Sequence, residues 1–178
     1  MNDRAENDRA EVWIVDSSPI ILLGKIRLSY LLGKMSGQLT IPEAVVRDID
    51  TALPEDLGRQ ALAEIIRNEN PIISPAESTL AIEAFRLGRG ETAVLSLALN
   101  PPGDKTAVVA ILDDKRARDA AASLGIRTRG TLGLLIQAKD SGEIEALVPY
   151  LHQLRTAGMW LDDARCRIIA HSVGETWA

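Results

Sequence analysis

Residues 107–114 read AVVAILDD, a run of six apolar residues followed by two aspartates. A short, continuous apolar run of this kind is typical of a strand buried on both faces, as in a parallel sheet covered by helices. A second such run, VWIV at residues 12–15, also ends in an aspartate. Because a helical pattern follows each run, the two segments predict β–α units in a parallel sheet, and therefore an α/β fold.

Three further strands, with helices between them, are expected around these two runs. Ser18 and Pro19 suit the cap and the first position of a helix, so a helix is predicted to begin there and to run through residues 20–32. The remaining strands are expected at residues 38–41, 71–74 and 125–128. Further helices are expected from residue 42, over residues 58–68, 77–87, 91–99 and 115–124, and from residue 131 onward.

The composition fits one domain and excludes several classes of site. The chain has 178 residues, enough for a full core without metal or disulfide staples. Its single cysteine, Cys166, excludes an intramolecular disulfide and a zinc site built from cysteines. The two histidines, His152 and His171, lie far apart in the sequence, which argues against a histidine-dependent triad. Three tryptophans, two tyrosines and one phenylalanine are few for a base-stacking surface, and argue against one.

Neither a membrane span nor a secretory signal is predicted. The longest apolar run covers residues 107–112, whereas a membrane-spanning helix needs about 18 apolar residues. The opening MNDRAENDRAE is polar and charged, without the apolar segment of a signal peptide. We therefore expect a cytoplasmic protein that has no membrane partner. The net charge of −5 argues against binding of nucleic acid by the whole surface, but not against a local basic patch.

Acidic residues stand where strands of the predicted sheet end. Asp16 follows the first strong strand, and the pair Asp113 and Asp114 follows the second. Glu91 opens the helix before that second strand, and Asp48 borders the apolar stripe of its own helix. Because sites in parallel sheets form at the carboxyl ends of the strands, these acids are expected to converge there. Each acid taken alone also suits a helix cap or a solvated helix position.

Convergence of these acids would favour a metal site. Several carboxylates within a few ångströms repel one another, so some must take up a proton unless a cation neutralises them. Oxygen ligands without histidine or cysteine suit hard ions such as Mg²⁺ or Mn²⁺. Such an ion can activate water and polarise phosphate oxygens. The pattern therefore favours metal-dependent hydrolysis of a phosphate ester.

A local excess of positive charge supports a polyanionic substrate. Five cationic residues fall between positions 115 and 129, against a single acid, and we expect them to flank the acidic edge and to contact nucleic acid: Lys115, Arg116, Arg118, Arg127 and Arg129. A solvated helix face followed by a surface loop explains the same residues equally well.

Five segments in the same order resemble the PIN-domain superfamily, and more narrowly its prokaryotic, toxin-type branch. They are IVDSSPIILLGKI (14–26), IPEAVVRDI (41–49), GRGETAVLSLAL (88–99), AILDDKRARDAAASLGI (110–126) and GTLGLLIQAKDSGEI (130–144). The resemblance runs from about residue 12 to about residue 173. It implies a three-layer fold with a parallel five-strand sheet in the order 3-2-1-4-5 and helices on both faces. It also implies cleavage of RNA with Mg²⁺ or Mn²⁺ bound by acidic residues.

The resemblance also assigns roles to particular residues of this chain. The catalytic acids would be Asp16, Asp48, Glu91 and Asp114, and the metal ligands would be Asp16, Glu91, Asp113 and Asp114. Asp48 stands where the family usually has glutamate, so its shorter side chain is expected to reach the metal through water. Ser17 and Ser18 would orient ligands or water.

The same resemblance divides the chain and suggests its partners. A polar tail covers residues 1–11, the PIN-like domain covers 12–142, and a helical extension over 143–178 is expected to pack on the same domain. The extension would otherwise offer a surface to a second copy of the chain, in a homodimer, or to an antitoxin. RNA is the expected substrate, and the toxin of a toxin–antitoxin pair is the expected role.

Other functions fit parts of the pattern. One alternative is a PIN-like module with a nucleic-acid-binding or regulatory role, which would have the same fold but little or no catalytic activity. A receiver domain needs an acidic pair after its first strand, whereas here the pair follows the fourth. A haloacid-dehalogenase-type phosphatase needs Asp-x-Asp after the first strand, where this chain has Asp16, Ser17 and Ser18.

Overall fold

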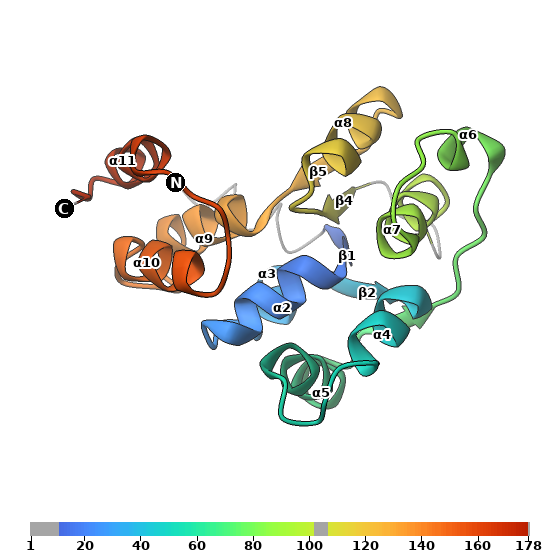
Figure 1. The fold of residues 1–178 in the computed structure, drawn as a ribbon, viewed down its shortest axis with the longest axis horizontal. Helices are drawn as coiled ribbons and strands as arrows, with labels where there is room; N and C mark the ends of the chain where they lie inside the picture. Colours follow the sequence, from blue (N-terminus) through green and yellow to red (C-terminus); the bar gives the residue numbers. More distant parts are fainter. Residues whose placement is uncertain (1–10, 102–106, 178) are drawn as a thin grey trace.

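A computed structural model describes residues 11–101 and 107–177 of the chain (Figure 1). Its five strands form one parallel sheet in the order β3-β2-β1-β4-β5. The predicted α/β class and strand order are therefore confirmed. The strands are β1 (Val12–Val15), β2 (Gln38–Pro42), β3 (Ile72–Ser74), β4 (Val108–Ile111) and β5 (Arg127–Arg129).

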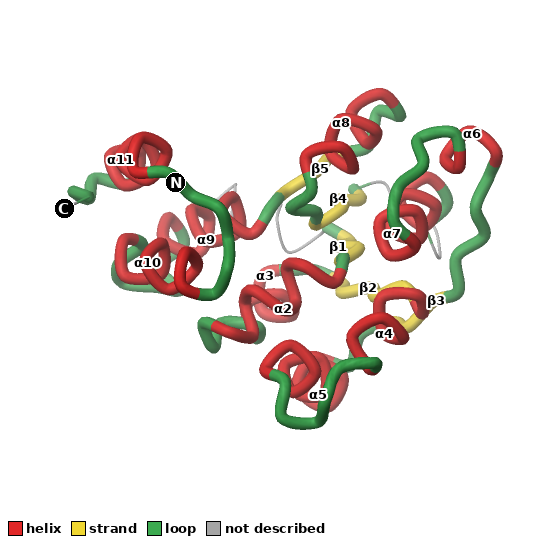
Figure 2. The backbone as a smooth tube through the Cα atoms, in the orientation of Figure 1, coloured by secondary structure: helices red, strands yellow, loops and turns green. Residues whose placement is uncertain are grey.

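Helices cover both faces of this sheet. Figure 2 shows α7 on one side of the strands and α2 with α9 and α10 on the other. On the first side α7 packs across β1, β2 and β4, while on the second α2 packs against α5 and α9. The helices are α2 (Ser17–Lys25), α3 (Leu31–Met35), α4 (Glu43–Asp50), α5 (Leu57–Glu69), α6 (Leu80–Glu83), α7 (Arg89–Leu99), α8 (Lys115–Ser123), α9 (Thr131–Asp140), α10 (Val148–Thr156) and α11 (Asp163–Ser172).

The predicted bounds of three helices are wrong. The helix expected to begin at Pro19 and to run to residue 32 starts earlier, at Ser17, and breaks at Arg27, whose φ is 59°. The break lets Ile26 and Leu28 both be buried, which a continuous helix does not allow because residues two apart face different directions. The helix expected over residues 77–87 is reduced to α6, and α7 begins two residues before Glu91.

The core is aliphatic apart from one indole. All four residues of β1 are buried, and Trp13 at its centre is fully enclosed. The helical extension contributes to the same core through a set of buried side chains: Leu147, Leu151, Leu154, Leu161 and Cys166. Lys25 of α2 also donates a hydrogen bond of 3.1 Å to the carbonyl of Ala157. No helix in the described parts of the chain is long and apolar enough to cross a bilayer.

Glu175 fixes the start of α10 from the far end of the extension. Its carboxylate accepts hydrogen bonds from the backbone N–H groups of Leu147 (2.8 Å) and Val148 (2.8 Å). Burial raises the pKa of Glu175, but these N–H groups and Lys139 outweigh that effect and hold the pKa below its ordinary value. The carboxylate therefore satisfies donors that a helix N-terminus otherwise leaves unpaired.

We expect Glu175→Ala to lower the free energy of unfolding by about 1–2 kcal/mol, the usual cost of losing a helix cap. Urea unfolding at pH 7 measures this loss. Glu145→Ala is the control, because Glu145 is exposed and precedes the same helix. Equal midpoints for the two variants would show that the Glu175 contacts do not hold the extension in place.

Candidate active site at the carboxyl edge of the sheet

Asp16 is a buried carboxylate directly after β1. Only 4% of the residue is exposed, and its Oδ1 atom has no hydrogen-bond partner among the described residues. Burial raises its pKa from 3.8 to about 6. The N–H groups of Ser17 and Ser18 oppose this rise, whereas the negative charges of Glu91 and Asp113 add to it. Asp16 therefore carries charge at neutral pH without a positive partner beside it.

Gly90 brings Asp48 close to Asp16. A Cβ atom on Gly90 would lie 2.6 Å from Oδ1 of Asp16 and 3.7 Å from Oδ2 of Asp48. The two carboxylates therefore both lie next to the Cα atom of Gly90 in α7. Asp16 approaches it from the end of β1, and Asp48 approaches it from α4, where Asp48 is exposed. Asp48, which the sequence places at the border of the apolar stripe of α4, thus lies near the carboxylate of Asp16.

Glu91 serves as a helix cap and also lies within electrostatic reach of Asp16. Its Oε2 atom accepts a hydrogen bond of 2.7 Å from the N–H group of Gly88 at the start of α7. Its charge is also one of the causes that raise the pKa of Asp16. Glu91 therefore caps α7 and also lies near enough to Asp16 to affect the pKa of that carboxyl group.

The two aspartates after β4 have different surroundings. Asp113 accepts two hydrogen bonds from Thr131, one from its backbone N–H (2.8 Å) and one from its hydroxyl (2.6 Å). Asp114 is exposed and caps α8, where its Oδ1 accepts from the N–H of Ala117 (2.9 Å). The charge that acts on Asp16 is that of Asp113. The resemblance placed Asp114 first, whereas the geometry gives the inner position to Asp113.

A cleft of about 540 Å³ opens beside these acids. Its walls include Ser18, Glu91, Asp113, Asp114 and Arg118, while Asp16 and Asp48 are not among the lining residues. Part of the lining comes from the helical extension: Met159, Trp160, Leu161 and Arg165. Sequence reasoning missed Trp160 and Arg165, because nothing in the local pattern of residues 157–165 indicates which part of the fold they face.

The family comparison concerns nearly the whole described chain. A family model described as PIN domain matches residues 12–175 of the chain. The chain belongs to the PIN-domain family. PIN domains are generally nucleases and typically use divalent metals, so this chain has a nuclease-type fold. A search of curated proteins found no match. The family match extends past residue 142 and so includes most of the helical extension.

Of the five expected nucleic-acid contacts in this PIN domain, Arg118 lines the cleft. Its guanidinium donates to the carbonyls of Leu112 (3.3 Å) and Asp113. Lys115 pairs with Asp119 one turn along α8, and Arg116 reaches the carbonyl of Phe85 at 3.4 Å. These last two side chains are exposed at the start of α8.

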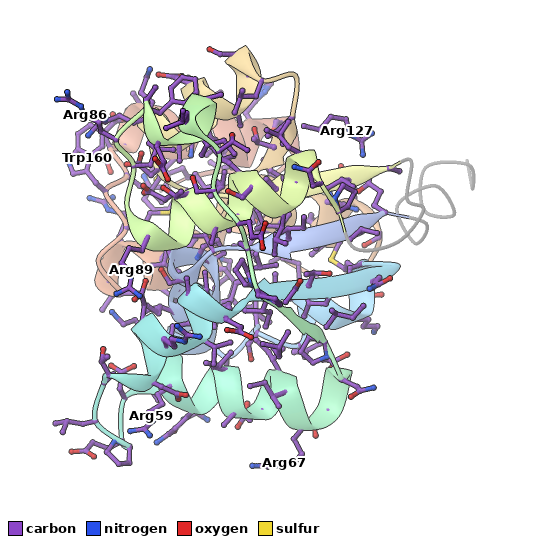
Figure 3. All side chains as sticks on the ribbon, turned by 90° about the vertical axis from the view of Figure 1, so that its right-hand side faces the viewer. Arg59, Arg67, Arg86, Arg89, Arg127 and Trp160 are labelled. Atoms are coloured by element: carbon purple, nitrogen blue, oxygen red, sulfur yellow. The ribbon has the colours of Figure 1, made fainter. Side chains whose placement is uncertain are left out.

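Arg127 and Arg129, two of the expected nucleic-acid contacts of the PIN domain, are engaged in ion pairs within the fold. Both pair with the carboxylate of Glu11, which precedes β1, and Arg129 also lies over the ring of Trp13. In Figure 3, Arg127 lies at the opposite edge from Arg86, Arg89 and Trp160. The partner of these two arginines is more than a hundred residues away in the sequence, so the local pattern did not reveal it.

The donor set of this PIN domain fits a hard cation, although it forms no closed metal cage. Within residues 11–101 and 107–177, no three histidine, cysteine, aspartate or glutamate side chains are grouped closely enough to hold a metal ion. Mg²⁺, however, commonly takes one or two carboxylates and keeps several waters. The unpaired buried oxygen of Asp16, with only carboxylates near it, is the feature that such an ion would satisfy.

Proposed function

We propose that this PIN domain is an endoribonuclease that hydrolyses phosphodiester bonds of RNA with Mg²⁺ or Mn²⁺. The observation that carries the proposal is the buried, unpaired Oδ1 atom of Asp16 beside two further negative charges. A buried charge without a partner costs several kcal/mol. Proteins keep such a group where a cation or a reaction requires it, and perturbed carboxylates of this kind concentrate at functional sites.

The carboxylates would have different roles, according to their positions around the ion. Asp16 and Glu91 would hold the ion directly, with Asp113 kept in place by Thr131 and with Asp114 at the rim of the cleft. A divalent ion held by these residues would supply Lewis-acid chemistry for the hydrolysis of a phosphate ester. Asp48 would act through water, and Ser17 and Ser18 would orient that water. Arg118 would contact a phosphate of the RNA strand in the cleft.

One observation favours the alternative, a module that binds nucleic acid but has little activity. No group of three ligands stands ready for a metal in the described residues. Such a module would bind RNA equally well with and without divalent ions and would cleave none. Metal dependence therefore separates the two functions.

We expect the purified protein to cleave some members of a panel of labelled RNAs in Mg²⁺ or Mn²⁺ and none in chelator. Asp48→Asn should lower the cleavage rate constant about tenfold or more, because the charge that orients water is lost. Asp50→Asn is the matched control on the same helix, since Asp50 is exposed and pairs with Arg59. RNA binding without cleavage in every lane would support the alternative, and cleavage that persists in chelator would contradict the metal mechanism.

The finer expectations stay predictions. They are the toxin role, an antitoxin protein as partner, a homodimer and a cytoplasmic location. Of the apolar residues in the extension that could form a partner surface, most are buried in the core, whereas Trp160 and Ile168 are exposed.

A further inference from the structure

We propose that Trp160 is a substrate-positioning residue, which stacks on an unpaired base of the strand whose backbone lies against the acids. The inference rests on the proposed function for the identity of that strand as RNA. It assigns to the helical extension a direct part in substrate binding. It also revises the expectation from composition, because one well-placed indole is enough to hold one base.

Trp160 differs from the other two tryptophans in its exposure. It is 80% exposed, whereas Trp13 is fully buried and Trp177 is half-buried and stacked on His152 at 4.0 Å between ring centroids. So exposed an indole contributes little to folding. Trp160 lines the same cleft as Glu91 and Asp113, so an apolar ring and charged groups are available to one bound strand.

The turn that carries Trp160 is held on both sides. Gly158 adopts a φ of 105°, which side chains rarely tolerate, and the N–H of Met159 donates to the carbonyl of Leu154 at 2.9 Å. After Trp160, Leu161 is buried in the core, and Asp162 caps α11 through the N–H of Arg165. The indole is therefore presented by an anchored turn, which reduces the entropy lost when a base stacks on it.

Arginines near Trp160 complete a surface suited to a single strand. Arg118 and Arg165 line the same cleft as Trp160. Arg86 and Arg89 are exposed and lie at the same edge of the molecule as Trp160 (Figure 3). Within the described residues, Arg86, Arg89 and Arg165 form no ion pair with an acidic side chain. Aromatic faces combined with guanidinium groups are the usual means of binding single-stranded nucleic acid.

The test compares the binding of two strands by four forms of the protein, in chelator so that nothing is cleaved. One strand is oligoadenylate of about ten nucleotides, and the other is an abasic strand with the same number of phosphates. The wild type should bind oligoadenylate about tenfold more tightly than the abasic strand, the scale of one base–aromatic stack. Trp160→Ala should remove most of this preference, and Trp160→Phe should keep part of it.

Leu80→Ala supplies the matched control, because Leu80 is 85% exposed on α6 and does not line the cleft. It should keep the preference of the wild type. An unchanged preference in Trp160→Ala, or a wild type that binds neither strand, would overturn the role of Trp160. Because these titrations need no activity, they decide the question even if the protein cleaves no RNA.

Cleavage kinetics separate the two proposals. If the wild type cleaves RNA, Trp160→Ala should raise KM about tenfold, because base stacking contributes to binding before and during the reaction. Failure of the wild type to cleave any RNA would count against the ribonuclease proposal alone. Normal cleavage with an unchanged KM in Trp160→Ala would count against the stacking proposal alone.

Discussion

Asp16→Asn is expected to reduce divalent-dependent RNA cleavage about a hundred- to a thousandfold, while it makes the metal-free protein more stable. The loss of activity follows from removal of the charge that would hold the ion. The gain in stability follows from burial, which raises the pKa of Asp16 from 3.8 to about 6. A rise of that size corresponds to about 3 kcal/mol at most, less the cost of burying the new amide.

The gain should depend on pH in a defined direction. Between about pH 4 and pH 6 the folded protein keeps a proton on Asp16 that the unfolded chain has already released, so stability falls as pH rises through this window. Asparagine does not titrate, and its advantage should therefore be full above pH 6 and absent below pH 4. Urea unfolding of both proteins in chelator, at pH 4 and at pH 7.5, measures the difference in stability below and above this window.

Mg²⁺ provides a control within the same experiment. It should stabilise the wild type, because it binds the folded state, and should have little effect on Asp16→Asn. If Asp16→Asn is less stable than the wild type at pH 7.5 in chelator, the buried carboxylate is paired in a way that the structure does not contain. If Mg²⁺ stabilises both proteins equally, Asp16 is not a ligand.

Gly90→Ala is expected to lower cleavage about tenfold to a hundredfold and to destabilise the fold by about 1–3 kcal/mol. The added methyl group would lie 2.6 Å from Oδ1 of Asp16 and 3.4 Å from Cγ2 of Val45, and both of these residues are buried. One of them must move, and the carboxylate moves away from the position that faces Asp48. Cleavage assays and urea unfolding measure the two effects.

Gly133→Ala is the control for stability. Helix propensity alone favours alanine over glycine by up to about 1 kcal/mol, so a crowding effect must exceed this gain to be seen. In α9, a methyl group on Gly133 would meet only the flexible side chain of Arg129, at 3.2 Å. Equal changes in unfolding free energy for Gly90→Ala and Gly133→Ala would mean that Asp16 is not held against α7.

The strands and the edge at which they end could be predicted because their signals are local. The apolar runs 12–15 and 107–112 are too short for helices and too continuous for a strand with one wet face. The parallel pairing of β1 with β4 then places Asp16 near Asp113, and the electrostatic effect between these residues agrees with it. The order of the strands followed from the resemblance, and not from the runs themselves.

The details that could not be predicted depend on contacts between distant segments. Asp113 and Asp114 are equivalent in the sequence, and it is Thr131 that selects the inner one. The pairing of Arg127 with Glu11 joins the start of the last strand, β5, to the residue before the first strand, β1. Trp160 faces the cleft because the extension folds back on α2, where Lys25 meets Ala157. Neither periodicity nor composition carries information of this kind.

The central place of β1 determines when the acids first meet during synthesis of the chain. As the ribosome extends the protein, β1 finds β2 early, but its other neighbour, β4, begins only at Val108. The side chain of Asp113 is fixed only after Thr131 has been synthesised and folded, because Thr131 donates both of the hydrogen bonds that hold it. A partial chain that is still attached to its own messenger RNA therefore lacks the assembled cluster. Any cutting activity that needs these acids together starts only after the chain has been synthesised and folded past Thr131.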